Sequence, residues 1–361
     1  MNPVTRCTQA ITLALAILLS NTFSFAAAAI WGPASSNNGN LQIFFIDVEG
    51  GQATLFITPT GESLLVDTGW PGNKGRDADR IVSVAKKAGL TRIDFVLITH
   101  FHTDHVGGVP QLVSRIPVGT FIDHGINREL DHGITEHGYA AYQTILATTG
   151  AKHITLVPGD RLPINGLRAT VISSDGNLLD APLPGARGAG QPNRFCKSSA
   201  TRPADQTENA RSLGIELDFG KLRILDLGDL TWDKEMQLMC PTNKLGTIDI
   251  LIVSHHGWDH SSSPALIDAI HPRVAIMDNG ATKGGSPAVL ETIAKAPGLE
   301  TLWQLHYSEE GGAKDNTRPE YIANPLGPDM GNDLELTAAP SGSFTVLNPA
   351  THFTKSYAAK P

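Results

Sequence analysis

The segment HFHTDH, residues 100–105, contains four side chains whose types and spacing suit metal binding. His100 and His102 are two residues apart, and Asp104 and His105 are adjacent. A loop at the end of a strand can direct the first pair towards one metal ion and the second pair towards another. Imidazole and carboxylate groups together favour zinc, with iron and manganese as further candidates. The segment therefore predicts a centre for two divalent metal ions, with Zn²⁺ favoured.

Further acidic and His motifs follow apolar runs in the second half of the chain. Asp229 closes the run LRILDLGD, and His255 follows ILIVS. The segment TRIDFVLITHFHTDH (91–105) aligns without gaps with GTIDILIVSHHGWDH (246–260). Both carry Ile-Asp, an apolar strand, a His at the strand end and a final Asp-His. This repetition indicates an internal duplication and predicts two similar halves.

Alternating strands and helices must position these ligands. Runs rich in apolar and β-branched residues, separated by Gly or Pro, cover residues 41–48, 52–59, 62–69 and 93–100 and predict strands. Residues 77–90 carry apolar positions at helical spacing. A strand that ends at a ligand, beside a helix and other strands, indicates α/β layers. Two such halves predict an α/β fold with four layers, an αββα sandwich.

Less regular stretches are expected beside the site. Residues 154–160 and 167–174 suggest a hairpin, after which residues 175–208 are rich in Gly, Pro, Asn and Ser. A loop of this length inside a compact domain is often functional. The His-rich stretch 121–142 is the other candidate for a segment that faces the substrate.

The motif HFHTDHVGG (100–108) resembles the HxHxDHxGG signature of the metallo-β-lactamase superfamily. The order of motifs is closer to the hydrolase domain of ComEC-type competence proteins. In this chain that order reads IDVEGGQATLF, LLVDTG, the HxHxDH loop, SLGIELDFGKLRILDLGD and ILIVSHHG. The resemblance covers residues 41–282, and it implies a metal-dependent hydrolase with the sandwich of that superfamily.

The resemblance also implies a role for each ligand. It assigns His100 and His102 to the first metal, Asp104, His105 and His255 to the second metal, and Asp229 to a bridge between the two ions. Asp67, in LLVDTG, would fix the orientation of one of these ligands. Asp226, its counterpart in the second half, is expected to be structural.

The chain departs from many relatives at residues 207–212, where they carry a third His for the first metal and this chain reads TENARS. The first metal then keeps an exchangeable position, open to water, Asn209 or Ser212. His124 or His132 could supply the missing ligand instead. If neither does, we expect two unequal metal sites, with the second ion held more tightly.

The predicted metals suggest a hydrolytic mechanism. A bound water would have its pKa lowered to about 7, giving hydroxide at neutral pH. With Asp104 orienting it, that hydroxide would attack a carbonyl or phosphoryl centre. His256 and His260 are the candidate proton donors for the leaving group, with His306 as a further candidate. The alternative for each of these three histidines is a structural role.

The first residues of the chain predict export. Residues 1–29 have the basic start, short apolar core and small residues of a signal peptide, with cleavage expected between Ala26 and Ala29. The apolar run is shorter than the roughly 20 residues that span a bilayer, so we expect no stable membrane span after cleavage. The expected product is a single domain over residues 30–361, in the periplasm or secreted.

The same export bears on the cysteines. Cleavage would remove Cys7 and leave Cys196 and Cys240. An oxidising compartment makes a disulfide between these two plausible. Two unpaired, buried thiols are the alternative.

Charge narrows the function further. The net charge of −8 gives no general attraction to nucleic acid, and no strong nucleic-acid patch is expected. The function predicted first is an exported hydrolase that uses a metal-bound hydroxide, with phosphodiester or nucleotide substrates favoured. The alternatives are an ester, amide or lactam hydrolase of the same fold, and a non-catalytic extracytoplasmic binding protein. Whether the substrate is a small molecule or a polymer stays open.

Overall fold

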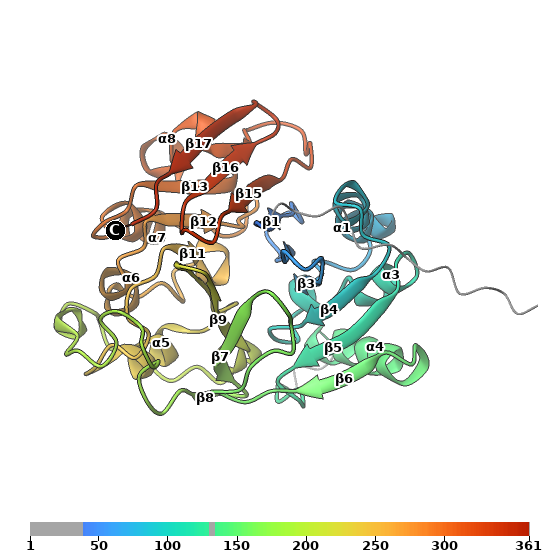
Figure 1. Cartoon of the computed structure of the whole chain (residues 1–361), viewed down its shortest axis with the longest axis horizontal. Helices are drawn as coiled ribbons and strands as arrows, with labels where there is room; N and C mark the ends of the chain where they lie inside the picture. Colours follow the sequence, from blue (N-terminus) through green and yellow to red (C-terminus); the bar gives the residue numbers. More distant parts are fainter. Residues whose placement is uncertain (1–38, 130–133, 361) are drawn as a thin grey trace, which may run out of the picture. The chain divides into compact units, whose positions relative to one another are not determined.

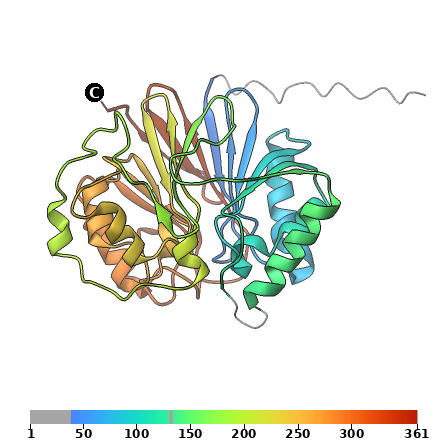
Figure 2. The ribbon, with the colours of Figure 1, turned by 90° about the horizontal axis from the view of Figure 1, so that it is seen from below.

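The computed structural model describes residues 39–129 and 134–360, which form one compact unit. Two β-sheets pack face to face in its middle, and helices cover the outer face of each sheet (Figure 1, Figure 2). The predicted four-layer αββα sandwich is therefore confirmed. The predicted signal peptide, residues 1–29, lies outside the described residues.

The first sheet has nine strands in the order β17-β16-β15-β1-β2-β3-β4-β5-β6. Strands β1 to β3 pair antiparallel, and β3 to β6 pair parallel. The strands are β1 (Leu41–Phe45), β2 (Thr54–Ile57), β3 (Ser63–Val66), β4 (Ile93–Leu97), β5 (Val118–Asp123), β6 (Lys152–Thr155), β15 (Leu334–Ala338), β16 (Phe344–Asn348) and β17 (Phe353–Tyr357).

The second sheet has eight strands in the order β14-β13-β12-β11-β10-β9-β7-β8. Strands β10 to β14 run parallel, so their carboxyl ends lie along one edge of the sheet. The strands are β7 (Arg168–Ser174), β8 (Asn177–Leu178), β9 (Gly214–Phe219), β10 (Leu222–Asp226), β11 (Ile250–Ile252), β12 (Val274–Met277), β13 (Thr301–His306) and β14 (Ile322–Asn324).

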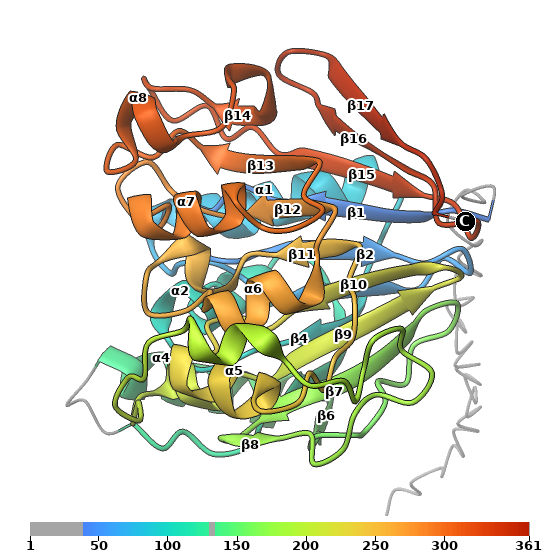
Figure 3. The same cartoon turned by 90° about the vertical axis from the view of Figure 1, so that its left-hand side faces the viewer.

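Three apolar clusters hold the layers together. The cluster between the sheets includes Ile43 of β1 and Ile224 of β10, both fully buried. Ile81, Leu112 and Tyr142 pack three helices, α1, α3 and α4, onto the first sheet. A third cluster packs α5, α6 and α7 onto the second sheet, whose covered face is seen in Figure 3. Burial of both faces of the central strands, such as β2, β3, β11 and β12, explains their nearly continuous apolar sequences.

The helices are short. The α-helices are α1 (Arg76–Lys87), α2 (Thr103–Val106), α3 (Val109–Val113), α4 (Ile134–Thr148), α5 (Trp232–Met239), α6 (Pro264–Ile270), α7 (Pro287–Ala294) and α8 (Gly312–Asp315). The 3₁₀ helices are η1 (Asn73–Gly75), η2 (Arg194–Lys197), η3 (Glu208–Arg211), η4 (Ser254–Gly257) and η5 (Pro319–Tyr321). No helix in the described ranges is long and apolar enough to cross a membrane.

The structure differs from the predicted halves at the carboxyl end. Strand β15 pairs antiparallel with β1, with Leu41 opposite Ala338, so β15 to β17 extend the first sheet. The predicted hairpin is also partly wrong. Its first strand ends early, because β6 pairs with β5, and Pro158 and Gly159 then interrupt it. Of the predicted partner segment, only the short stretch around Arg161 pairs with β7.

A disulfide joins Cys196 of η2 to Cys240, the residue after α5, across a Cα–Cα distance of 5.8 Å. The long irregular stretch before residue 208 is thereby tied to the second half of the chain. The disulfide is present, and the alternative of two unpaired thiols is not.

Candidate metal centre

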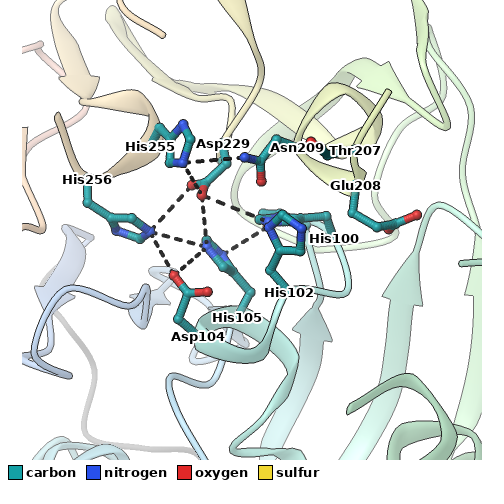
Figure 4. Close-up of polar contacts among 12 residues, drawn as sticks. His100, His102, Asp104, His105, Thr207, Glu208, Asn209, Asp229, His255 and His256 are labelled. Carbon is teal, nitrogen blue, oxygen red and sulfur yellow. Dashed lines mark hydrogen bonds and ion pairs between the residues drawn. The ribbon is translucent and has the colours of Figure 1, made fainter. Parts of the chain in front are cut away.

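Three strand ends bring the predicted ligands together, as Figure 4 shows. The HFHTDH segment, residues 100–105, follows β4 of the first sheet and ends in α2. Asp229 follows β10, and His255 and His256 lie in η4 after β11. Because β10 and β11 are parallel neighbours, their loops leave the second sheet side by side. The two sheets thus present their ligands to each other.

Asp229 lies at the centre of these ligands. Its Oδ2 atom is 3.3 Å from Nε2 of His105 and 3.4 Å from Nε2 of His255. Nε2 of His100 is 3.9 Å from the same oxygen, and Nε2 of His256 is 3.5 Å from Oδ1. A buried carboxylate with imidazole nitrogens around both oxygens suits a bridging ligand.

One group of ligand atoms lies on the Asp104 side of Asp229. Asp104, His105, Asp229 and His256 each offer one atom, and these four atoms lie within 4.8 Å of one another. Oδ2 of Asp104 is 3.3 Å from Nε2 of His105 and 3.2 Å from Nε2 of His256. Two imidazoles and two carboxylates form a donor set that suits zinc. The structure brings His256 into this group, where the resemblance implied His255.

The other predicted ligands lie farther from Asp104: in Figure 4, His100 and His102 are to the right of Asp229, and His255 is above it. The rings of His100 and His102 are neighbours, with centroids 4.6 Å apart. Nε2 of His255 is 3.4 Å from Nδ2 of Asn209, which lies in the segment 207–212. Within the described residues, Nε2 of His100 and Oδ1 of Asn209 have no hydrogen-bond partner although both are buried. These atoms fit a second cation beside Asp229.

The backbone explains how two adjacent histidines reach both sides. His255 and His256 have left-handed conformations, with φ of 57° and 54°. Such a conformation costs a non-glycine residue about 1–3 kcal/mol. The two rings diverge, with centroids 6.3 Å apart and planes at 70°. Gly257 follows with φ of 80°, where a Cβ atom would lie 2.6 Å from Sδ of Met277.

Carboxylates behind the ligands fix two imidazole rings. Asp67 accepts hydrogen bonds from the Thr99 backbone N–H at 2.8 Å and from Nδ1 of His105 at 2.7 Å. Nε2 of His105 is therefore the nitrogen that faces Asp229. Glu129 lies 3.0 Å from Nε2 of His102, which leaves Nδ1 of that ring for a metal. Asp67 thus has the orienting position that the resemblance implied.

The carboxylates make the site strongly attractive to positive charge. Burial raises the pKa of Asp229, but His105 and its neighbours outweigh it and hold that pKa well below 3.8. Burial and Lys283 lower the pKa of His256, yet Asp229 and Asp104 raise it to about 10. Burial holds the pKa of His100 well below 6.5, which keeps that ring in the neutral, metal-binding form. The electrostatic environment of the site therefore favours divalent cations.

The other candidates for the first metal are placed differently. Nε2 of His124 is 2.9 Å from the Glu208 carboxylate, so that ring already has a buried partner. Ser212 is buried, and its Oγ has no hydrogen-bond partner among the described residues. His132 lies outside the described residues. Among the candidates in the described ranges, Asn209 is the one with a hydrogen-bond contact to a predicted ligand.

The three predicted proton donors lie in different surroundings. His256 is buried among the ligands, as described above. The His260 side chain is 65% exposed, and its ring centroid is 5.8 Å from that of His255. Nε2 of His306 is 2.7 Å from Asp47, in a separate group with Glu49.

Sequence reasoning missed Lys283, which pairs with Asp104 and donates a hydrogen bond to the Gly50 carbonyl at 2.6 Å. It also missed Glu129, the partner of His102. One signal for Lys283 was available, because it follows an apolar strand, β12, that neighbours the strand before His255. Glu129 lies in the His-rich stretch 121–142 that was expected to face the substrate, but no motif singled it out within that stretch.

Residues 47–179 match a family profile described as "Metallo-beta-lactamase superfamily". The chain is 26% identical over 241 residues to Recombination protein 2 of Haemophilus influenzae, covering 66% of this chain and 24% of that protein. It is 22% identical over 268 residues to ComE operon protein 3 of Bacillus subtilis, covering 69% of this chain and 29% of that protein. It is 31% identical over 121 residues to a hydroxyacylglutathione hydrolase of Xylella fastidiosa, covering 34% of this chain and 36% of that protein.

The chain spans about a quarter of the length of the first two relatives. The segment that matches the family profile contains Asp67 and the HFHTDHVGG motif. This segment forms part of the αββα layers. The motif, the layers and the positions of the predicted ligands all agree with the family match. Residues 47–179 therefore match the metallo-β-lactamase superfamily, the fold has the layers of that superfamily, and the chain is similar to the ComEC-type competence proteins.

Proposed function

We propose that the chain is an exported hydrolase with two divalent metal ions, zinc foremost, that cleaves phosphodiester or nucleotide substrates. The observation that carries this proposal is the position of Asp229, within 4 Å of four imidazole nitrogens from two directions. The similarity to Recombination protein 2, a protein named for recombination, supports the choice of phosphodiesters. Export rests on the predicted signal peptide.

The ligand side chains divide between the two ions. His100, His102 and His255 would hold one ion, Asp104, His105 and His256 the other, and Asp229 both. When bound, such ions supply Lewis acidity and lower the pKa of a bound water, which gives a nucleophile at neutral pH. Asp104 remains ionised at neutral pH, since Lys283 and His105 outweigh its burial and hold its pKa well below 3.8. It can therefore accept a hydrogen bond from the attacking group and orient it.

The leaving group requires a proton. His256 is buried between Asp104 and Asp229, so its ring is better suited to hold an ion than to protonate a leaving group. His260 is open to solvent beside His255 and can approach a leaving group. We therefore assign the donor role to His260 and the ligand role to His256.

A second candidate function is hydrolysis of an acyl bond. The similarity to a hydroxyacylglutathione hydrolase favours it, and the same ligand geometry can polarise a carbonyl oxygen. The two candidates differ in the charge and geometry of the reacting centre and not in the metals they need.

A substrate panel tests the proposal. The full chain is stripped with a chelator, reloaded separately with zinc, manganese and iron, and assayed on a phosphodiester, a glutathione thioester and a β-lactam. We expect phosphodiester cleavage that disappears on stripping and returns on reloading. Cleavage of the thioester alone would replace the first candidate with the second. No cleavage of any of the three by protein with two bound ions would contradict both.

A further inference from the structure

Lys283 brings a positive charge from the second sheet to the metal ligands. It lies in the loop between β12 and α7, where the Gly280 N–H donates to the Lys283 carbonyl at 2.9 Å and closes a tight turn. Strand β12 is the parallel neighbour of β11. The loop therefore leaves the same sheet edge as the tandem histidines His255 and His256.

Two glycines let this loop approach the first half of the chain. A Cβ atom at Gly50 would lie 2.9 Å from the backbone nitrogen of Gly280 and 3.0 Å from Cβ of Lys283. A Cβ atom at Gly280 would lie 2.9 Å from the carbonyl carbon of Glu49. Only glycine permits contact this close, so the backbone itself fixes Lys283 beside the ligands.

The ammonium group has two protein partners. Nζ pairs with Oδ2 of Asp104 and donates to the Gly50 carbonyl at 2.6 Å. Among the described residues these acceptors take two of its three N–H donors, and the third remains for a ligand. The side chain is 21% exposed, so part of it is open to solvent.

Two indole rings flank the ammonium. Nζ lies 5.3 Å from the ring centroid of Trp70 and 5.9 Å from that of Trp258. Trp258 is 39% exposed although it is a large apolar residue. Aromatic faces at this distance stabilise a cation and displace water from it, which strengthens its attraction to an anion.

A lysine that only balances the charge of Asp104 requires neither solvent access nor two aromatic neighbours. We propose that Lys283, between Trp70 and Trp258, binds an anionic oxygen of the substrate at the metal centre. This rests on the proposed function and deepens it, because a phosphodiester carries a negative charge on the reacting group and a neutral ester does not. Lys283 would thus select phosphodiesters over uncharged acyl substrates.

Phosphate binding tests this assignment without relying on hydrolysis. The zinc-loaded full chain is titrated with inorganic phosphate by calorimetry, for wild type, Lys283→Met and Lys283→Arg. Lys295→Met is the matched control, because Lys295 is an exposed lysine on the neighbouring helix that pairs with Glu291. We expect Lys283→Met to raise the Kd for phosphate by roughly tenfold or more, as loss of a charged hydrogen bond does. The Kd of Lys283→Arg should stay closer to the wild-type value, and the Kd of the Lys295→Met control should equal the wild-type value.

Zinc content, measured on each sample, separates the outcomes. Unchanged phosphate affinity in Lys283→Met with zinc retained overturns the assignment. Loss of zinc together with loss of phosphate binding also overturns it, because Lys283 would then only position Asp104.

Kinetics distinguish this inference from the function on which it rests. We expect Lys283→Met to raise the KM for a phosphodiester by a larger factor than the KM for an uncharged ester, because only the phosphodiester carries a charged oxygen on the reacting group. If wild type binds phosphate through Lys283 but cleaves no phosphodiester, the anion site stands and the proposed function fails.

Discussion

Nδ1 of His105 lies 2.7 Å from Oδ2 of Asp67, so the other ring nitrogen of this histidine points at Asp229. The same carboxylate accepts hydrogen bonds from the Thr99 hydroxyl at 2.7 Å and from the Thr99 N–H at 2.8 Å. A ligand whose tautomer and ring angle are fixed in this way binds a metal more tightly than one that rotates freely.

Asp67→Asn should therefore weaken metal binding while leaving every predicted ligand in place. We expect the affinity for the ion held by Asp104, His105 and His256 to fall by roughly 10–100-fold, measured by competition with a chromophoric chelator. Asp226→Asn is the matched control, since Asp226 has the equivalent place in the second half but bonds to Gln52 at 2.7 Å. Equal metal affinity in wild type and Asp67→Asn would show that the contact does not orient the ligand.

The tandem histidines should control different ions. Because His256 lies within the group of Asp104, His105 and Asp229, we expect His256→Ala to lose the more tightly held ion. His255→Ala should lose the weaker ion, held with His100 and His102. Stepwise chelation with elemental analysis measures both variants. Loss of the same ion from both, or of two ions together with one affinity, would refute the division between two unequal sites.

The Cys196–Cys240 disulfide should stabilise the fold without affecting the metals. It closes a loop between residues 44 positions apart, and its removal should lower the free energy of unfolding by about 2–4 kcal/mol. Urea denaturation of Cys196→Ser, Cys240→Ser and the double variant measures this loss, which should be equal in all three. Two reactive thiols in denatured, unreduced wild type would contradict the pairing.

Asp333 should make stability depend on pH. Burial, with the charge of Asp47 beside it, raises the pKa of Asp333 from 3.8 to about 7. The folded chain keeps this proton between those values and the unfolded chain loses it, so the free energy of unfolding falls as pH rises. The fall is at most about 1.4 kcal/mol per pH unit. Asp333→Asn should remove it, because the amide oxygen can still accept the Asp47 N–H, which lies 2.9 Å from Oδ1.

Urea denaturation at several pH values measures this effect. The stability of Asp333→Asn relative to wild type should increase from pH 4 to pH 7, the window set by the two pKa values of Asp333. A difference that stays constant over that window would mean that this carboxyl does not retain its proton in the folded chain.

The sequence predicted the parts of the site that are local. His100 to His105 follow a buried strand directly, and Asp229 follows another, so each motif could be identified within a few residues. The sandwich was predictable because both its halves repeat the same strand and ligand order. The division of His255 and His256 between the two sides of Asp229 was not, since it depends on two left-handed backbone angles.

The contacts that join distant segments were beyond local reasoning. Lys283 meets Asp104 across 179 positions of sequence, through backbone contact between Gly50 and Gly280. Likewise, β15 pairs with β1, although the sequence of neither strand predicts this pairing. Such contacts depend on packing of the whole domain, which periodicity and motif spacing do not encode.

Stoichiometric reloading of the stripped protein tests the central claim most directly. Zinc is added in steps to the full chain and to Asp229→Ala, and bound metal and phosphodiester cleavage are measured at each step. Wild type should reach full activity as the second ion per chain binds, whereas Asp229→Ala should hold at most one ion tightly and remain inactive. Cleavage by the stripped protein, or two tightly bound ions with full activity in Asp229→Ala, would contradict a two-metal centre bridged by Asp229.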